Sequence, residues 1–171
     1  DFETLWTTSN NNSLNITLNS TRQKGSFSIR LVTNATNAVN HNITMDLTAA
    51  GAVNLTNYNR LLFWLYANTT GNLFNFSFGA NNYSDFNFSI GGNVANIWEQ
   101  KVIDISTIPV LNRSAVRYLM FNVTTSTPFS ALIDDLEASN QISLLDNGLN
   151  GDSVASDAVY TALYNISPQN N

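Results

Sequence analysis

A two-residue alternation of polar and apolar side chains runs through this sequence and constrains its fold more than any other feature. In the segment 75–78, Asn75 and Ser77 alternate with two phenylalanines, and segments 87–90 and 122–124 repeat the pattern. Successive side chains of a β-strand point to opposite faces, so such a segment places apolar residues on one face and polar residues on the other. Because no segment has the 3.6-residue period of an amphipathic helix, the pattern predicts an all-β protein.

Ten candidate strands are separated by clusters of glycine, asparagine and proline, which are typical of turns. Their short length and regular spacing favour an antiparallel jelly-roll β-sandwich. We expect residues 1–138 to form this sandwich, and residues 139–171 to form a linker and an extension strand. The predicted strands are Glu3–Thr8, Leu14–Asn19, Ser26–Thr33, Asn42–Ala49, Arg60–Asn68, Leu73–Gly79, Tyr83–Ile90, Lys101–Ile105, Val116–Thr124 and Ala131–Glu137.

The composition excludes two classes of partner. Only 7 Lys and Arg stand against 12 Asp and Glu, for a net charge of −5, and the basic residues are scattered. Nucleic acid is therefore excluded, because no basic patch is available for its phosphates. No apolar run approaches the roughly 20 residues that span a bilayer. The chain has no cysteine, so no disulfide holds the fold. It begins at Asp1 without methionine, which fits a processed protein secreted to the cell surface or beyond, and the choice of sequence boundaries is the alternative explanation.

Acceptor motifs for N-glycosylation are about twice as frequent as the asparagine, serine and threonine content alone predicts. Several coincide with the alternation, so that the asparagine and its hydroxyl partner share the outer face of a strand. This arrangement indicates a heavily glycosylated extracellular surface, and an asparagine-rich genome is the alternative explanation. The thirteen motifs begin at Asn11, Asn15, Asn19, Asn34, Asn42, Asn54, Asn68, Asn75, Asn82, Asn87, Asn112, Asn122 and Asn165.

The supply of reactive residues argues against catalysis. The one histidine, His41, follows an asparagine-rich stretch, and we expect it to lie in an exposed loop. No serine lies in a nucleophile-elbow motif. Glycoside cleavage needs two carboxylates that face a cleft, and nothing in the spacing places Glu99 and Asp104 opposite each other. The sequence therefore predicts that the protein is not an enzyme.

A family resemblance rests on six short segments that follow one another in a set order. They are Asp1-Phe2-Glu3 with Trp6, Lys24–Ile29, Leu55–Tyr66, Trp98 with Val102–Ser106, Tyr118–Phe121 and Ile133–Leu136. Over roughly residues 1–138 this order resembles the jelly-roll carbohydrate-binding modules that have a galactose-binding-like fold. The resemblance is more specific for the fold than for a function, because this sandwich serves many roles.

The resemblance implies a structural Ca²⁺ ion that links the two ends of the sandwich. Carried over by position, Glu3 and Asp135 would be its side-chain ligands, with Asp134 as the alternate and backbone carbonyls near Lys24 and Gly25 completing the shell. Hard oxygen ligands from distant parts of the chain suit Ca²⁺. The alternative is that the two aspartates simply face water.

Sugar recognition by such a module requires exposed aromatic rings. Trp6, Trp64 and Trp98 fall where this fold places aromatic residues in its core. The tyrosines at 58, 66, 83 and 118 remain as candidates to line a face, and core or rim packing is the alternative for each. We take Tyr66 and Tyr83 as the candidate sugar contacts.

The C-terminal part has a different character. The segment 146–161 resembles a motif that opens immunoglobulin-like domains in secreted surface proteins, although positions 147, 156 and 158 depart from it. Asp146, Asp152 and Asp157 lie on a glycine-bearing loop that suits a hard cation. An ordinary polar linker is the alternative.

A strand-like segment ends the chain, and it is too short to form a domain of its own. It folds back onto its own sandwich, belongs to a longer protein, or adds to the sheet of a neighbouring copy. The segment consists of Val159, Tyr160, Thr161, Ala162, Leu163, Tyr164, Asn165 and Ile166.

Two functions from different classes follow. The first is a non-catalytic structural subunit, similar to the glycoprotein subunits of microbial surface filaments, that joins copies of itself head to tail by strand addition. Its partners would be its own copies and covalently attached glycans. The second is a carbohydrate-binding module of a larger secreted enzyme or adhesin.

Overall fold

The computed structural model describes residues 5–9, 14–23, 26, 28–33, 39–125 and 128–140. Ten strands and a short 3-10 helix, η2 (Val110–Arg113), lie in this part of the chain. No helix among the described residues is long and apolar enough to cross a membrane. The strands are β1 (Trp6–Ser9), β2 (Leu14–Asn19), β3 (Ser28–Thr33), β4 (Val39–Asp46), β5 (Arg60–Ala67), β6 (Leu73–Gly79), β7 (Phe86–Gly91), β8 (Glu99–Asp104), β9 (Tyr118–Thr125) and β10 (Phe129–Ser139).

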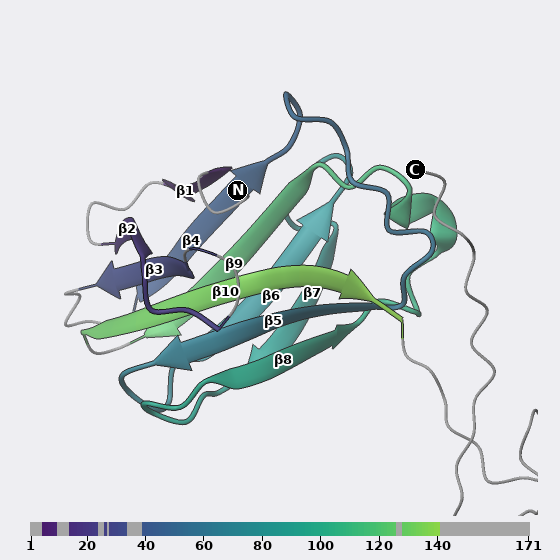
Figure 1. Ribbon diagram of the computed structural model, residues 1–171. Helices are drawn as coiled ribbons and strands as arrows, with labels where there is room; N and C mark the ends of the chain where they lie inside the picture. Colours follow the sequence, from purple (N-terminus) through teal and green to yellow (C-terminus); the bar gives the residue numbers. More distant parts are fainter. Residues whose placement is uncertain are drawn as a thin grey trace, which may run out of the picture. The chain divides into compact units, whose positions relative to one another are not determined.

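The strands form two antiparallel sheets of five strands each, so the predicted all-β sandwich is confirmed. Sheet A has the order β1-β4-β9-β6-β7, and sheet B has the order β2-β3-β10-β5-β8. In Figure 1, β10, β5 and β8 lie in front of β4, β9 and β6. Strands that are adjacent in a sheet are often distant in sequence, so the register of each sheet depends on non-local pairing.

The alternation in the sequence becomes the division between core and surface. Along β5 every second residue is buried, while the residues between them are half-exposed. Phe121 on β9 lies at the centre, with ring centroids 5.3 Å from Trp6, 5.0 Å from Phe63 and 4.9 Å from Phe76. Aromatic rings from both sheets therefore meet at one point, where they exclude water and bind the sheets together.

Several strand ends differ from the prediction by a few residues; β4, predicted over 42–49, spans Val39–Asp46. Two further differences have a clear physical cause or consequence. Strand β7 begins at Phe86 rather than at position 83, because Asp85 accepts the backbone N–H groups of Ala80 and Asn81 and closes a turn there. His41 lies in β4 and is fully buried, so the expectation of an exposed loop histidine was wrong. Its Nε2 atom lies 3.2 Å from the Thr33 hydroxyl, and its Nδ1 atom has no partner among the described residues.

The chain divides into a unit of residues 1–139 and a second of residues 140–171. The described part ends at Asn140. The predicted cation loop at Asp146, Asp152 and Asp157 and the predicted assembly strand 159–166 lie outside the described residues. They stay predictions.

We predict that Phe121→Ala lowers the free energy of unfolding by about 3–5 kcal/mol, because it leaves a cavity where aromatic rings from both sheets meet. Urea denaturation would measure the change. Leu111→Ala is the matched control: Leu111 is 84 % exposed, so its truncation should change stability by no more than about 0.5 kcal/mol. Equal losses in the two variants would contradict this account of the core.

We also predict that the protein loses stability between pH 7.5 and pH 5.5. Burial lowers the pKa of His41 from its ordinary 6.5. As the pH falls, the imidazole is therefore protonated in the unfolded chain before it is protonated in the folded one, which favours unfolding. Hydrogen bonds lower the pKa values of Asp46 and Asp104 from 3.8, so their contributions are lost only at a lower pH. Urea denaturation of His41→Gln should show a smaller loss over the upper range. An unchanged loss in that variant would assign the effect to other groups.

Candidate functional site

A row of asparagines crosses the outer face of sheet A. Five positions lie opposite one another on successive strands, in the order Ser9, Asn42, Asn122, Asn75 and Ser89. We call the three central side chains, Asn42, Asn122 and Asn75, the amide row. All three are half-buried, and the residues that alternate with them are buried in the core, so the row faces outward.

Hydrogen bonds join the side chains of the amide row. Asn122 Nδ2 donates to Asn42 Oδ1 at 2.5 Å, and Asn75 Nδ2 makes a longer contact of 3.5 Å with Asn122 Oδ1. Beside the row, the Thr124 hydroxyl donates to Asn40 Oδ1 at 2.6 Å. The donors all point in one direction across the strands, from β6 through β9 to β4. The face therefore presents fixed amide groups rather than mobile ones.

The same face carries almost no charge. The next row, Thr7, Thr44, Met120, Ser77 and Asn87, is also uncharged. Among the outward positions of the described strands of sheet A, Asp46 is the one ionisable carboxylate or cation. Such a face suits a neutral, hydroxyl-bearing ligand better than a charged one.

A pair of tyrosines lies at one end of this face. The rings of Tyr83 and Tyr118 meet edge to face with centroids 5.0 Å apart, and Thr48 Oγ1 lies 3.4 Å from the Tyr118 hydroxyl. Tyr118 extends from β9, whereas Tyr83 comes from the turn between β6 and β7. Burial raises the pKa of Tyr83 from its ordinary 10.0. A tyrosine hydroxyl is protonated at neutral pH in any case, and it can both donate and accept a hydrogen bond.

Gly79 allows the turn to bring Tyr83 to this position. A Cβ atom at Gly79 would lie 2.2 Å from the backbone oxygen of Asn82 and 2.3 Å from Asp85 Oδ2. Only glycine leaves room for the turn to fold back against the end of β6. The sequence shows the glycine and the aspartate, but their contact depends on the folded turn.

A second aromatic cluster lies on the outer face of sheet B. Tyr66 and Trp98 have ring centroids 5.6 Å apart, and the Tyr66 hydroxyl donates to Asn96 Oδ1 at 3.1 Å. Trp64 and Trp98 are half-buried on this side, so the expectation of core positions holds for Trp6 and is wrong for these two. Tyr66 and Tyr83, the predicted sugar contacts, thus lie on opposite outer faces and do not form one site.

The predicted glycosylation motifs fall on several parts of the surface. Four have outward-facing asparagines on sheet A, as the alternation predicts, and two lie on β2. Attachment of glycans to any of them stays a prediction. Those on sheet A are Asn42, Asn75, Asn87 and Asn122, those on β2 are Asn15 and Asn19, and Asn54, Asn68, Asn82 and Asn112 lie between strands, whereas Asn11, Asn34 and Asn165 are outside the described residues.

The two carboxylates considered for glycoside cleavage do not face each other. Glu99 accepts the backbone N–H of Val94 at 2.8 Å and lies 3.5 Å from the Lys101 ammonium. Asp104 lies on the same strand, β8, five positions further on, and an odd spacing places the two on opposite faces.

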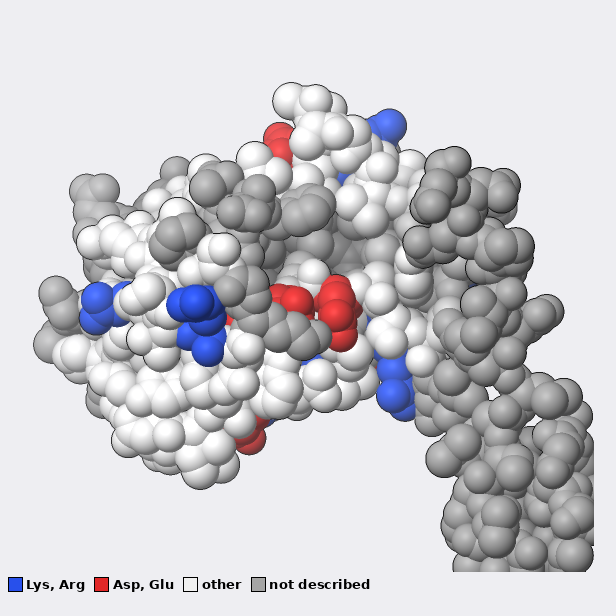
Figure 2. Space-filling view, in the orientation of Figure 1, with Lys and Arg blue, Asp and Glu red and all other residues white. Residues whose placement is uncertain are grey.

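Acidic residues gather on β10, where the strand is irregular. A β-bulge separates Asp134 from Glu137, and Asp135 within it has a left-handed φ of 55°. Asp134 is buried, and its Oδ2 atom accepts the backbone N–H of Gln23 at 2.6 Å. Figure 2, in the orientation of Figure 1, shows acidic side chains near the middle of the side of the molecule on which β10 lies in front.

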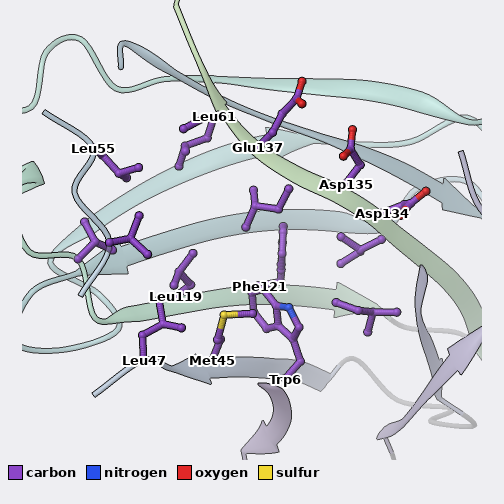
Figure 3. Close-up of a pocket in the computed structure, with 16 residues that line it drawn as sticks. Trp6, Met45, Leu47, Leu55, Leu61, Leu119, Phe121, Asp134, Asp135 and Glu137 are labelled. Atoms are coloured by element: carbon purple, nitrogen blue, oxygen red, sulfur yellow. The ribbon is translucent and has the colours of Figure 1, made fainter. Parts of the chain in front are cut away.

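The acidic residues border a cavity of about 420 Å³ between the sheets. Apolar side chains, including Trp6, Met45 and Phe121, line its floor. In Figure 3 the carboxyl groups of Asp135 and Glu137 point away from this floor. Asp134, Asp135 and Glu137 all have interaction partners, so none of them is an unpaired charge.

The described residues alone do not complete the predicted calcium site. Their oxygen donors suit a hard cation, but Asp134 already accepts a backbone N–H, and no group of three metal-ligand residues occurs in the described part of the chain. Glu3, the third predicted ligand, lies outside the described residues, as do Lys24 and Gly25. The Ca²⁺ ion stays a prediction.

Comparisons with known proteins identify solved structures that have a similar fold. No protein-family model matches the chain, and no curated protein sequence matches it significantly. A family 11 carbohydrate-binding module from Clostridium thermocellum, in complex with a β-1,3-1,4-mixed-linked tetrasaccharide, is 9 % identical over 80 % of this chain and 89 % of its own, with a TM-score of 0.60. A family 30 module of a cellulosomal cellulase from the same organism is 16 % identical over 80 % of this chain and 92 % of its own, with a TM-score of 0.59.

Two further solved structures widen the comparison. A family 61 module in complex with β-1,4-galactotriose covers 82 % of this chain and 94 % of its own at 14 % identity, with a TM-score of 0.51. An exo-β-agarase covers 92 % of this chain at 10 % identity and a TM-score of 0.64, but the match spans only 27 % of that enzyme. At such identities the likeness establishes a shared jelly-roll sandwich fold and leaves the function to be argued from the site.

We predict that Ca²⁺ raises the melting temperature of the full chain relative to a chelator, because an ion bound only by the folded state stabilises it. Thermal unfolding followed by circular dichroism would measure the shift. Glu3→Gln and Asp135→Asn should each abolish it, whereas Asp104→Asn, at an exposed position on β8, should leave it intact. Equal melting temperatures of the natural chain with Ca²⁺ and with chelator would refute the site.

Proposed function

We propose that this chain is a non-catalytic carbohydrate-binding sandwich that holds a neutral glycan on the outer face of sheet A. The observation that carries this proposal is the amide row with the Tyr83–Tyr118 pair at one end of its face. The similar solved structures include sandwiches bound to a tetrasaccharide and to a galactotriose, which supports a glycan as the ligand class.

Amide side chains match the chemistry of sugar hydroxyls. A hydroxyl both donates and accepts hydrogen bonds, and an asparagine amide offers two donor hydrogens and an accepting oxygen. The hydrogen bonds of Asn122 with Asn42 and Asn75 hold these groups in place before a ligand arrives. Less conformational entropy is then lost on binding than with mobile surface side chains.

The extent of the row points to a chain of sugars rather than a single ring. The row and its flanking serine positions cross all five strands of the sheet, a width of about 19 Å at the usual spacing between strands. An extended oligosaccharide that lies on the amide row and reaches Tyr118, four residues and about 13 Å along β9 from Asn122, would span several sugar rings. Because Asp46 is the one outward carboxylate or cation on the described strands of sheet A, the glycan that fits this face is neutral.

The tyrosine pair supplies the apolar part of the site. Sugar rings have apolar C–H faces that pack against aromatic rings. The Tyr118 hydroxyl already contacts Thr48, and a hydroxyl can form a further hydrogen bond with a ligand. Tyr83 and Tyr118 are both half-exposed, so a ligand can reach them. The outer face of sheet A therefore offers both an aromatic ring pair and a row of amides to a glycan.

An extracellular location fits this role, because cell-wall and matrix polysaccharides lie outside cells. The structural role in a surface filament also stays a prediction, since it depends on the segment 159–166. Both roles can belong to one protein, because the segment proposed for assembly and the face of sheet A are different parts of the chain.

The test is affinity electrophoresis in gels that contain β-1,3-1,4-mixed-linked glucan, β-1,4-galactan or another neutral polysaccharide. We predict that at least one of them retards the natural chain. Tyr118→Ala and Tyr83→Ala should each weaken the affinity at least tenfold, which corresponds to about 1.4 kcal/mol. Thermal unfolding would show whether each variant remains folded.

The matched variant is Tyr66→Ala, which removes a tyrosine from the opposite face. Its retardation should equal that of the natural chain. Loss of binding in Tyr66→Ala with full binding in Tyr83→Ala would move the site to sheet B. A natural chain that no neutral polysaccharide retards would overturn the proposed function.

A further inference from the structure

Three predicted glycosylation motifs lie next to one another in a single row of the folded sheet. Asn122 on β9 is directly opposite Asn42 on β4 and also directly opposite Asn75 on β6. Neighbouring strands are about 4.8 Å apart, so Asn122 lies about that far from each partner. Asn42 and Asn75 are separated by the whole of β9, which doubles their distance.

The nitrogen that would carry a glycan already has a position within the row. Asn122 Nδ2 points along the row toward Asn42 Oδ1 at 2.5 Å, and Asn75 Nδ2 points toward Asn122 Oδ1 at 3.5 Å. A glycan bonded to Nδ2 needs that nitrogen directed into solvent. The modified side chain must then turn out of the row, and its half-buried neighbour loses a hydrogen-bond partner.

Steric crowding further limits which asparagines of the row can carry glycans at the same time. An N-linked glycan is bulky, and its first sugar ring is wider than the spacing between two strands. Glycans on two directly opposed asparagines would occupy the same space. Glycans on Asn42 and Asn75 would have the width of an intervening strand between them.

We propose that a glycan on Asn122 excludes glycans on Asn42 and Asn75 of the same folded molecule, whereas Asn42 and Asn75 can be modified together. The frequent acceptor motifs of this chain are therefore not independent attachment sites. The cross-strand register decides which combinations coexist, and the central strand of the sheet carries the excluding position.

A consequence for binding rests on the proposed function. Asn122 is at the centre of the amide row, so a glycan there would cover the face on which we place the ligand. Modification at Asn122 would then suppress polysaccharide binding. The exclusion itself depends only on register and space, so it holds whether or not the face binds a ligand.

The test uses full-length chains that retain only two of the three motifs, secreted from a host that N-glycosylates. Alanine replaces the third residue of each motif that is to be removed, which abolishes its acceptor status and keeps its asparagine. All variants lose the ten motifs outside the amide row. Ser77→Ala leaves the pair Asn42 and Asn122, Thr44→Ala leaves Asn75 and Asn122, and Thr124→Ala leaves the control pair Asn42 and Asn75. Intact-mass spectrometry of the secreted protein counts the glycans on each molecule.

We expect molecules with two glycans from the control pair only, at least tenfold more abundant than from either pair that includes Asn122. A cooperative thermal transition in each secreted variant shows that the counted molecules are folded. Equal amounts of doubly modified protein from all three pairs would overturn the proposal. A control pair that never carries two glycans would overturn it as well, because adjacency would then not be the cause.

Affinity electrophoresis of the singly modified Asn122 form separates this inference from the proposed function. Exclusion in the mass spectra together with normal polysaccharide binding by this form would leave the exclusion standing. It would place the ligand elsewhere on the protein.

Discussion

Burial of aromatic and aliphatic side chains between the two sheets is the constraint on which the rest of this structure depends. Phe121, Phe76 and Phe63 fill the centre of the sandwich and leave each strand a single acceptable register. A shift of one residue would send the whole apolar set of a strand to the surface. The positions that alternate with this core are consequently fixed as well, and on sheet A they include three asparagines in one row. The amide row is thus a consequence of core packing, even though its three asparagines lie outside the core.

Much of the architecture was predictable because its signals are local. Alternation within single strands gave all ten strands and the outward direction of Asn42, Asn75, Asn87 and Asn122. The amide row was not predictable in the same way. Asn42 and Asn122 are 80 positions apart in sequence, and their opposition depends on the order of strands in the sheet. The pairing of Tyr83 with Tyr118 likewise depends on a turn that Asp85 closes and Gly79 makes room for. His41 was misplaced because its polar neighbours indicated a loop, whereas β4 begins at Val39 and carries His41 inward.

The asparagines of the amide row can interact with sugar in two ways, by covalent attachment of a glycan and by non-covalent binding of one. The sequence alone favours attachment, because the acceptor motif spans three positions and a strand exposes every second residue. The folded sheet adds what the motif cannot show, namely that neighbouring acceptors hydrogen-bond to each other and compete for space. The similar solved structures share this sandwich at 9–16 % identity, which supports the fold and leaves the location of a ligand open. The neutral amide face of sheet A provides the physical reason to place the ligand there rather than at the acidic residues of β10.

The measurement that tests this account most directly is a titration of the unglycosylated chain with a neutral oligosaccharide, followed by the side-chain amide and indole N–H signals in ¹⁵N-resolved NMR spectra. The account predicts that the Nδ2 signals of Asn42, Asn75 and Asn122 shift with a common saturation curve, while the indole signals of Trp64 and Trp98 on sheet B stay in place. Shifts confined to the two indoles, with unmoved amide signals, would contradict it.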